Sequence, residues 1–103
     1  MIRSFSPAIA KTVNIDVSAT SQRVLVASCN SPITVRIMNN GTATVWINWG
    51  DVTVTATTAN GLPIGPGVHE VLTFSPDQGG LLYIAAIAAG VSGRIYFTEG
   101  QGI

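Results

Sequence analysis

The chain has 103 residues, of which 10% are charged, and its five basic residues balance its five acidic ones. This length suits one domain with a single core. The zero net charge excludes the positive surface that binds nucleic acid or anionic lipid, and no apolar run reaches the roughly 20 residues of a membrane-spanning helix. Ordinary soluble domains have about 25% charged residues, so we expect other subunits to cover much of this surface. A monomer coated with Thr and Ser is the alternative.

The N-terminus and the cysteine content indicate where the protein is made. Residues 1–11 contain an early arginine but no continuous apolar segment, so they do not have the pattern of a secretion signal. Cys29 is the only cysteine, which leaves no intrachain disulfide. We therefore expect the protein to stay in the cytoplasm in which it is made, or to leave it inside a larger assembly.

The N-terminal part of the chain predicts two or three strands. In residues 1–10, Pro7 lacks a backbone donor, so this segment suits either an edge strand or an extended arm. Residues 11–18 alternate between apolar and polar side chains with the period of two of a half-buried strand. Residues 23–28 are almost continuously apolar and suit a central strand, which must end before Pro32.

Residues 33–58 predict a β-meander, in which consecutive strands pair. The apolar/polar alternation recurs three times here, and two turns with glycine separate the repeats, at residues 39–41 (Asn-Asn-Gly) and 49–51 (Trp-Gly-Asp). Asn and Gly adopt the positive φ angles that a tight hairpin needs. We therefore expect strands at residues 33–38, 43–48 and 52–57, with the other strands packed around them.

The rest of the chain predicts three more strands. Residues 58–67 contain two prolines and three glycines, which indicates a rigid loop. Residues 68–74 resume the alternation, and residues 94–98 form the last strand before a flexible tail at residues 99–103. Residues 81–88 are apolar on both faces, and although Ala and Leu also favour helix, the segment has no N-cap, so we expect a buried strand.

The sum of these elements predicts the fold class. Eight or nine short antiparallel strands, with turns about every ten residues and no convincing helix, are typical of a β-sandwich. We therefore expect an all-β protein in which residues 1–103 form a single sandwich of jelly-roll or immunoglobulin-like type.

The residues that carry catalytic or metal chemistry do not form a recognisable motif. Cys29 and His69 are a nucleophile and a base, but they lie forty positions apart, and a buried cysteine and a strand histidine are the ordinary explanation. One Cys, one His and scattered carboxylates show none of the spacings of a metal site, and the glycines of residues 61–67 precede neither a helix nor a Lys-Ser/Thr pair, as a phosphate loop would. The carboxylates also lack the spacing that pairs two of them for glycoside hydrolysis: Asp16, Asp51, Glu70, Asp77 and Glu99. We expect no cofactor and no enzymatic activity.

Aromatic side chains offer a different kind of surface. A platform for single-stranded nucleic acid also needs a cationic groove, which the charge balance does not provide, but a sugar-stacking surface around Trp46 and Trp49 stays open. The ordinary explanation places one tryptophan in the core and the other at a subunit contact, where tryptophan is enriched. The candidates for the platform are Trp46, Trp49, Tyr83, Tyr96 and Phe97.

Three stretches follow one another from residue 33 to the C-terminus: VRIMNNGTATVWINWGD, TTANGLPIGPGVHEVLTF and LYIAAIAAGVSGRIYFTEGQGI. They run from a strand, a turn with Asn and Gly and a strand ending near Gly-Asp, through a small polar run with Pro-Ile-x-Pro-Gly, to an apolar strand, a glycine turn and a closing strand. In this order they resemble small virion proteins of tailed bacteriophages, namely decoration (cement) or head-associated proteins with a compact β-sandwich. The resemblance extends over most of residues 33–103 and implies a structural protein without catalytic residues.

The resemblance also implies a location and partners. The protein would be made in the cytoplasm of the bacterial host and would reside in the virion, where cement proteins add buried apolar surface between capsomers. We expect a homo-oligomer, with a trimer first and a dimer second, that binds the major capsid protein or another virion protein but neither nucleic acid nor a membrane. A phage tail or fibre module that binds a host-surface glycan is the alternative, and a jelly-roll enzyme such as a cupin would need more histidines than His69 alone.

The expected contact residues lie in the arm at residues 1–10, in the tail at residues 99–103 and at the tryptophans. They are Ile2, Phe5, Ile9, Trp46, Trp49 and Ile103.

Overall fold

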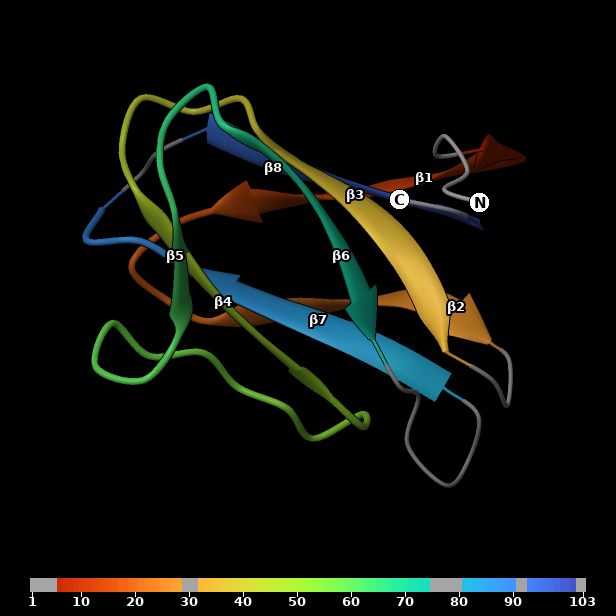
Figure 1. Cartoon of the computed structure of the whole chain (residues 1–103). Helices are drawn as coiled ribbons and strands as arrows, with labels where there is room; N and C mark the ends of the chain where they lie inside the picture. The colour runs from red at the N-terminus through yellow and green to blue at the C-terminus, as the bar shows by residue number, and fades with distance from the viewer. Residues whose placement is uncertain (1–5, 29–31, 75–80, 91–92, 102–103) are drawn as a thin grey trace.

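The computed structural model describes residues 6–28, 32–74, 81–90 and 93–101, which form eight strands and no helix (Figure 1). The expected all-β sandwich is confirmed. In the part of the chain that the structure describes, there is no helix that could cross a membrane. The strands are β1 (Ser6–Val17), β2 (Gln22–Ser28), β3 (Ile33–Asn39), β4 (Val45–Gly50), β5 (Leu62–Ile64), β6 (His69–Phe74), β7 (Leu81–Ile87) and β8 (Gly93–Gln101).

Two four-stranded antiparallel sheets pack face to face. Sheet A has the order β1-β8-β3-β6 and sheet B the order β2-β7-β4-β5. The ladders pair β1 with β8, β2 with β7, β3 with β6 and β4 with β5, so the pairs are nested from the chain ends inward. This nesting is the connectivity of a jelly roll. It differs from the strand grouping of an immunoglobulin-like sandwich, so the first of the two expected types is the correct one.

The period-two patterns place the apolar side chains between the sheets. Val35 and Ile37 of β3 and Val45 and Ile47 of β4 are fully buried, while the residues between them face outward. β7 is a central strand, and its inward residues Leu82, Ile84 and Ala86 are fully buried, so the interpretation of residues 81–88 as a strand of the core is confirmed. On its outer face Ala85 is buried, whereas Leu81 is exposed and Tyr83 and Ile87 are half-buried. The core cluster also contains residues from the other strands, among them Ile15, Val26, Phe74, Leu82, Ile84, Ile95 and Phe97.

The predicted β-meander is wrong. β3 and β4 belong to different sheets, and the turn after Asn39 carries the chain from sheet A to sheet B. The Asn39 side chain points inward and is fully buried, and its Oδ1 accepts a hydrogen bond from the Gly41 N–H at 2.9 Å. The same Asn and Gly chemistry that suits a hairpin therefore serves a crossing between sheets.

Residues 52–57, which were expected to form a strand, do not form one. The chain turns at Asp51, whose carboxylate accepts hydrogen bonds from the Thr53 N–H at 2.8 Å and from the Thr53 hydroxyl at 2.5 Å. The strand that pairs with β4 on this side is β5, which lies inside the segment expected to be a rigid loop. Pro63 fits there because β5 is an edge strand.

The chain ends form strands within the described residues. Residues 6–10 belong to β1 and residues 99–101 to β8, with Ser6 opposite Gln101 and Pro7 opposite Gly100. Of the two alternatives for residues 1–10, the edge strand therefore holds for residues 6–10, and the expected tail is strand as far as residue 101. Ile2, Phe5, Cys29, Asp77 and Ile103 lie outside the described residues.

Candidate functional site

The outer face of sheet A is polar. Arg94 lies opposite Asp16, and its Nε donates to the carboxylate at 2.8 Å, with both side chains exposed. This hydrogen bond raises the pKa of the Arg94 guanidinium above its ordinary value. Hydroxyls of Thr12 and Thr98 share a hydrogen bond of 2.8 Å across β1 and β8, and Arg36 of β3 lies on the other side of Thr98. This face therefore remains well hydrated.

The outer face of sheet B is mostly apolar. Leu25 of β2 lies opposite Tyr83 of β7, and Leu81 lies one row further along β7. Leu25 is 40% exposed and Leu81 is 36% exposed. Arg23 is the one charged residue that the described strands of sheet B place on this face. We call the apolar residues of this face the sheet B patch: Leu25, Trp46, Pro63, Leu81, Tyr83 and Ile87.

Residues 51–61 connect β4 to β5 in the chain, and we call them the strap. They cross the outer face of sheet B. The Asn48 side chain donates from Nδ2 to the Thr55 carbonyl at 3.2 Å. The Ala56 N–H donates to the hydroxyl of Ser21 at 2.9 Å, which ties the strap to the start of β2 on the far side of β7. Figure 1 shows the strap (green) on the side of sheet B that faces away from sheet A.

The strap covers the middle of the outer face and leaves apolar residues on both sides of it. Ala56 is buried in the strap, and Ala85 is fully buried although it faces outward on β7. Val54 lies over Gly50, within 3.7 Å of the position that a Cβ would occupy there. The apolar residues of the sheet B patch therefore lie around the strap, which hydrogen bonds hold to the sheet. Together the patch and the strap give this face a fixed shape.

The turn that starts the strap is held by a charged group. Hydrogen bonds from the hydroxyl and the backbone N–H of Thr53 lower the pKa of the Asp51 carboxyl, and the positive charge of Arg23 adds to the effect. Asp51 is therefore ionised at neutral pH and keeps the turn closed.

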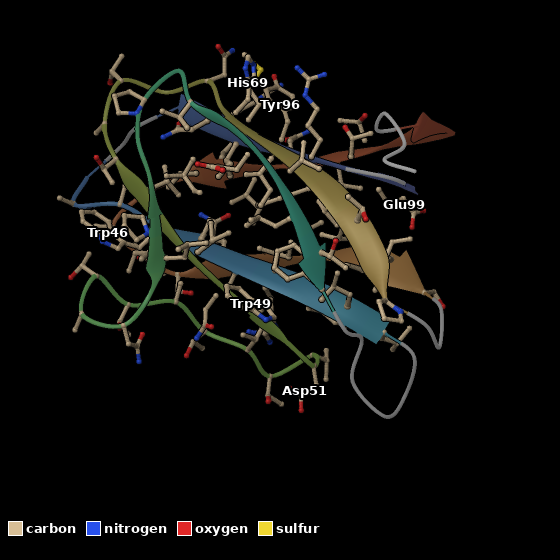
Figure 2. The ribbon with its side chains drawn as sticks, viewed as in Figure 1. Trp46, Trp49, Asp51, His69, Tyr96 and Glu99 are labelled. Atoms are coloured by element: carbon tan, nitrogen blue, oxygen red, sulfur yellow. The ribbon has the colours of Figure 1, made fainter. Side chains whose placement is uncertain are left out.

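The aromatic residues do not form one platform. Trp46 and Trp49 are three positions apart on an unbroken strand, so they project to opposite faces of sheet B. Trp46 lies on the outer face, whereas Trp49 is on the side of the core residues, with its ring centroid 5.0 Å from that of Phe74 and 41% of the residue exposed. Figure 2 shows the two side chains at separate places along β4. Of the other candidates, Phe97 is fully buried.

The titratable candidates are also separated. His69 lies on the outer face of sheet A, in one row with Met38 and Tyr96 (Figure 2). Asp51 belongs to the strap, and Glu70 is exposed on the edge strand β6. In the described ranges, no three His, Cys, Asp or Glu residues are grouped so that they could hold a metal ion.

The sequence indicates Trp46 and Tyr83 as candidates for an aromatic surface, but it does not indicate the other members of the sheet B patch. The expectation of a central strand at residues 23–28 is wrong, because β2 lies at the edge of sheet B, and Leu25 is exposed there. Searches against family models, curated proteins and solved structures found no match to this chain.

Proposed function

We propose that this chain is a structural component of a bacteriophage particle, a decoration protein that attaches to the head through the outer face of sheet B. The observation that carries the proposal is the sheet B patch, a set of apolar side chains on the outer face of sheet B. Sheet A presents Asp16, Arg36 and Arg94, whereas the side of sheet B presents the apolar patch beside Arg23 of β2 and Asp51 of the strap. A sandwich with one polar, hydrated outer face and apolar side chains exposed on the other is suited to bind a partner protein through the apolar face.

The strap favours attachment at low entropic cost. Ordering loops and side chains on association costs roughly 0.5–1.5 kcal/mol for each immobilised side chain. The strap is already fixed by the hydrogen bonds of Asn48 and Ala56, so this face changes little on binding. Burial of its apolar area, at about 25 cal/mol per Å², can then stabilise the contact between capsomers.

The partner of this face is the major capsid protein or another virion protein, and the protein acts as a homo-oligomer. A trimer suits the points of a capsid at which three capsomers meet, and a dimer is the nearest competitor. A tail or fibre module that binds a host glycan is the alternative. Because Trp46 and Trp49 project to opposite faces of sheet B, a glycan on the outer face has one tryptophan, Trp46, on which to stack.

The test uses particles of the phage that encodes the chain. Banded particles are separated into heads and tails, and each fraction is analysed by quantitative mass spectrometry. Many copies per head are expected. Absence of the chain from the particles refutes the proposal, and its presence in tails alone supports the alternative.

A second experiment tests the face. Heads that lack the protein are mixed with the purified chain, and bound protein is measured by co-sedimentation. Leu25→Glu places a charge in the sheet B patch and should weaken binding about tenfold or more, as the loss of a buried apolar contact of about 1.4 kcal/mol does. Asn14→Glu, which adds the same charge to the outer face of sheet A, is the matched control. Equal binding by both variants would show that sheet B is not the attachment face.

A further inference from the structure

We infer that the free edge of β6 pairs with β6 of a second copy of this chain, antiparallel and about a twofold axis. The two A sheets then form one continuous eight-stranded sheet. β6 ends the order of sheet A, and within the described residues β3 is its one strand neighbour. The inference concerns self-association and holds whether or not the partner of the sheet B patch is a phage head.

Three of the four sheet edges carry features that block pairing with another chain. β1 contains Pro7 and Lys11 and has a shift of register between Pro7 and Thr12. β2 has a shift of register between Leu25 and Ala27, and β5 is three residues long with Pro63 at its centre. Bulges, prolines, lysines and short strands are the devices by which natural sheets protect their edges.

β6 has fewer of these devices. Its six residues pair with β3 in unbroken register from His69 to Phe74, and the sequence HEVLTF contains no proline, glycine or lysine. Val71 is 38% exposed on the outer face at this edge. Glu70 is the one charged residue in the strand, and because it faces the side of sheet A that packs on sheet B, it is the one edge-protecting feature that the strand itself carries. This edge can therefore accept another strand, in a register that Glu70 helps to select.

The backbone groups that point to the free edge follow from the hydrogen bonds at the start of the ladder. The Asn39 N–H donates to the Val68 carbonyl at 3.2 Å, and the Gly67 N–H donates to the Asn39 carbonyl at 2.8 Å. The Asn40 N–H donates in the other direction, to the backbone carbonyl of Arg94 at the start of β8, at 2.9 Å. Bonded and non-bonded pairs alternate along an antiparallel ladder. The groups directed away from β3 are therefore those of His69, Val71 and Thr73.

These three residues fit a second copy of themselves. With Val71 on the twofold axis, Val71 lies opposite Val71 of the second copy, and His69 lies opposite Thr73. All three outward positions then form bonded pairs, each with two hydrogen bonds. A shift of the axis by one position in either direction leaves two such pairs.

Charge selects the same register. With the axis at Val71, Glu70 lies opposite Leu72 of the second copy. An axis at Glu70 would set the two carboxylates directly opposite each other, which destabilises a strand pair. An axis at Leu72 would place Glu70 opposite the buried Phe74. The symmetric pairing through Val71 avoids both arrangements, so the geometry favours the dimer over the trimer that the capsid symmetry suggests.

The test introduces a charge of either sign at Val71, the residue on the twofold axis. Val71→Lys and Val71→Glu each place two like charges opposite each other across the twofold axis, while the exposed outer position leaves the fold of the monomer intact. Sedimentation velocity should show a dimer for the wild type and a dimer at least about tenfold weaker for each variant alone. An equimolar mixture of the two variants should restore the dimer, because Lys then faces Glu. Asn14→Lys adds the same charge to the far edge of the same face and should remain dimeric.

Thermal unfolding of each variant checks that it is folded. A wild-type protein that stays monomeric at all concentrations, or that sediments as a trimer, overturns the inference. So does a mixture of the two variants that stays monomeric while both are folded. Because no phage head enters this experiment, its result does not depend on that of the attachment test.

Discussion

Asn39 is the polar group on which the end of the sandwich near β6 depends. It is fully buried at the end of β3. Its Nδ2 donates to the carbonyls of Ala43 and Ile64, both at 2.9 Å, and its Oδ1 accepts from the Gly41 N–H at 2.9 Å. These bonds tie the crossing from sheet A to sheet B to the end of β5, from which the chain leads into β6.

Replacement of Asn39 by Ala should lower the free energy of unfolding substantially. The Ile64 carbonyl is a buried acceptor, and leaving such a group without a partner costs about 1–3 kcal/mol. The other two bonds are partly buried and contribute about 0.5–1.5 kcal/mol each. The sum is about 2–6 kcal/mol, a large share of the 5–15 kcal/mol that stabilises an ordinary domain. Urea unfolding followed by tryptophan fluorescence measures the loss.

The control is the neighbouring exposed side chain. Asn40→Ala removes an amide of the same kind while the backbone bond from Asn40 to Arg94 stays, so its effect should stay within about 0.5 kcal/mol. If Asn39→Ala and Asn40→Ala cost the same, the three hydrogen bonds do not contribute as described.

Asn39→Asp tests the same site by pH. The carboxylate would face two carbonyl oxygens in a buried place, which raises its pKa in the folded state above the ordinary value of about 3.9. A raised carboxyl pKa means that the folded variant binds more protons than the unfolded chain, so its stability relative to the wild type should be greatest below about pH 4 and should fall as the pH rises through the folded-state pKa. A difference from the wild type that is constant between pH 4 and pH 8 would refute this reasoning.

Two further predictions concern the strap. Gly61→Ala should destabilise the protein by about 1–3 kcal/mol, because the added Cβ would lie 2.7 Å from the Cβ of Trp46, whereas Gly90→Ala meets nothing within 4 Å and should be nearly neutral in the same unfolding assay. The pKa of the Asp51 carboxyl, measured by NMR titration, should lie below its ordinary value and rise in Thr53→Val, which lacks the donating hydroxyl. The depressed pKa stabilises the turn above about pH 4, and this contribution is lost as the pH falls through the folded-state value. An unchanged midpoint in the variant would contradict this.

Local patterns were sufficient to locate most strands. Alternation with a period of two reports which side chains face the core, whatever the partner strand is, and residues 33–38 and 68–74 were placed in this way. The same patterns do not identify the partner. Asn39 and Gly41 suit a hairpin and a crossing between sheets equally well, and the choice depends on a buried amide that contacts Ile64, twenty-five positions away.

The strap and β5 show how contacts far along the chain override local preference. Residues 52–57 alternate like a strand, but the hydrogen bonds of Asp51 turn the chain out of the sheet before they begin. β5 has three residues and a proline, which is below the length at which alternation can be recognised. The separation of Trp46 from Trp49, in contrast, follows from their odd spacing on one strand and could have been predicted from the sequence.

The two proposed surfaces are compatible because of the geometry of antiparallel pairing. Residues that lie opposite each other project to the same face of a sheet, so the twofold axis at Val71 is perpendicular to the joined A sheets. Both polar outer faces then lie on one side of the dimer, and both sheet B patches lie on the other. A dimer built in this way presents two copies of the patch to one partner surface, where the second contact forms intramolecularly and can strengthen attachment by about 10²–10⁴ without a new kind of contact. Leu25→Glu changes the sheet B patch and Val71→Lys changes the dimer contact. The first should therefore weaken attachment while the dimer stays intact, and the second should give a monomer whose sheet B patch is unchanged.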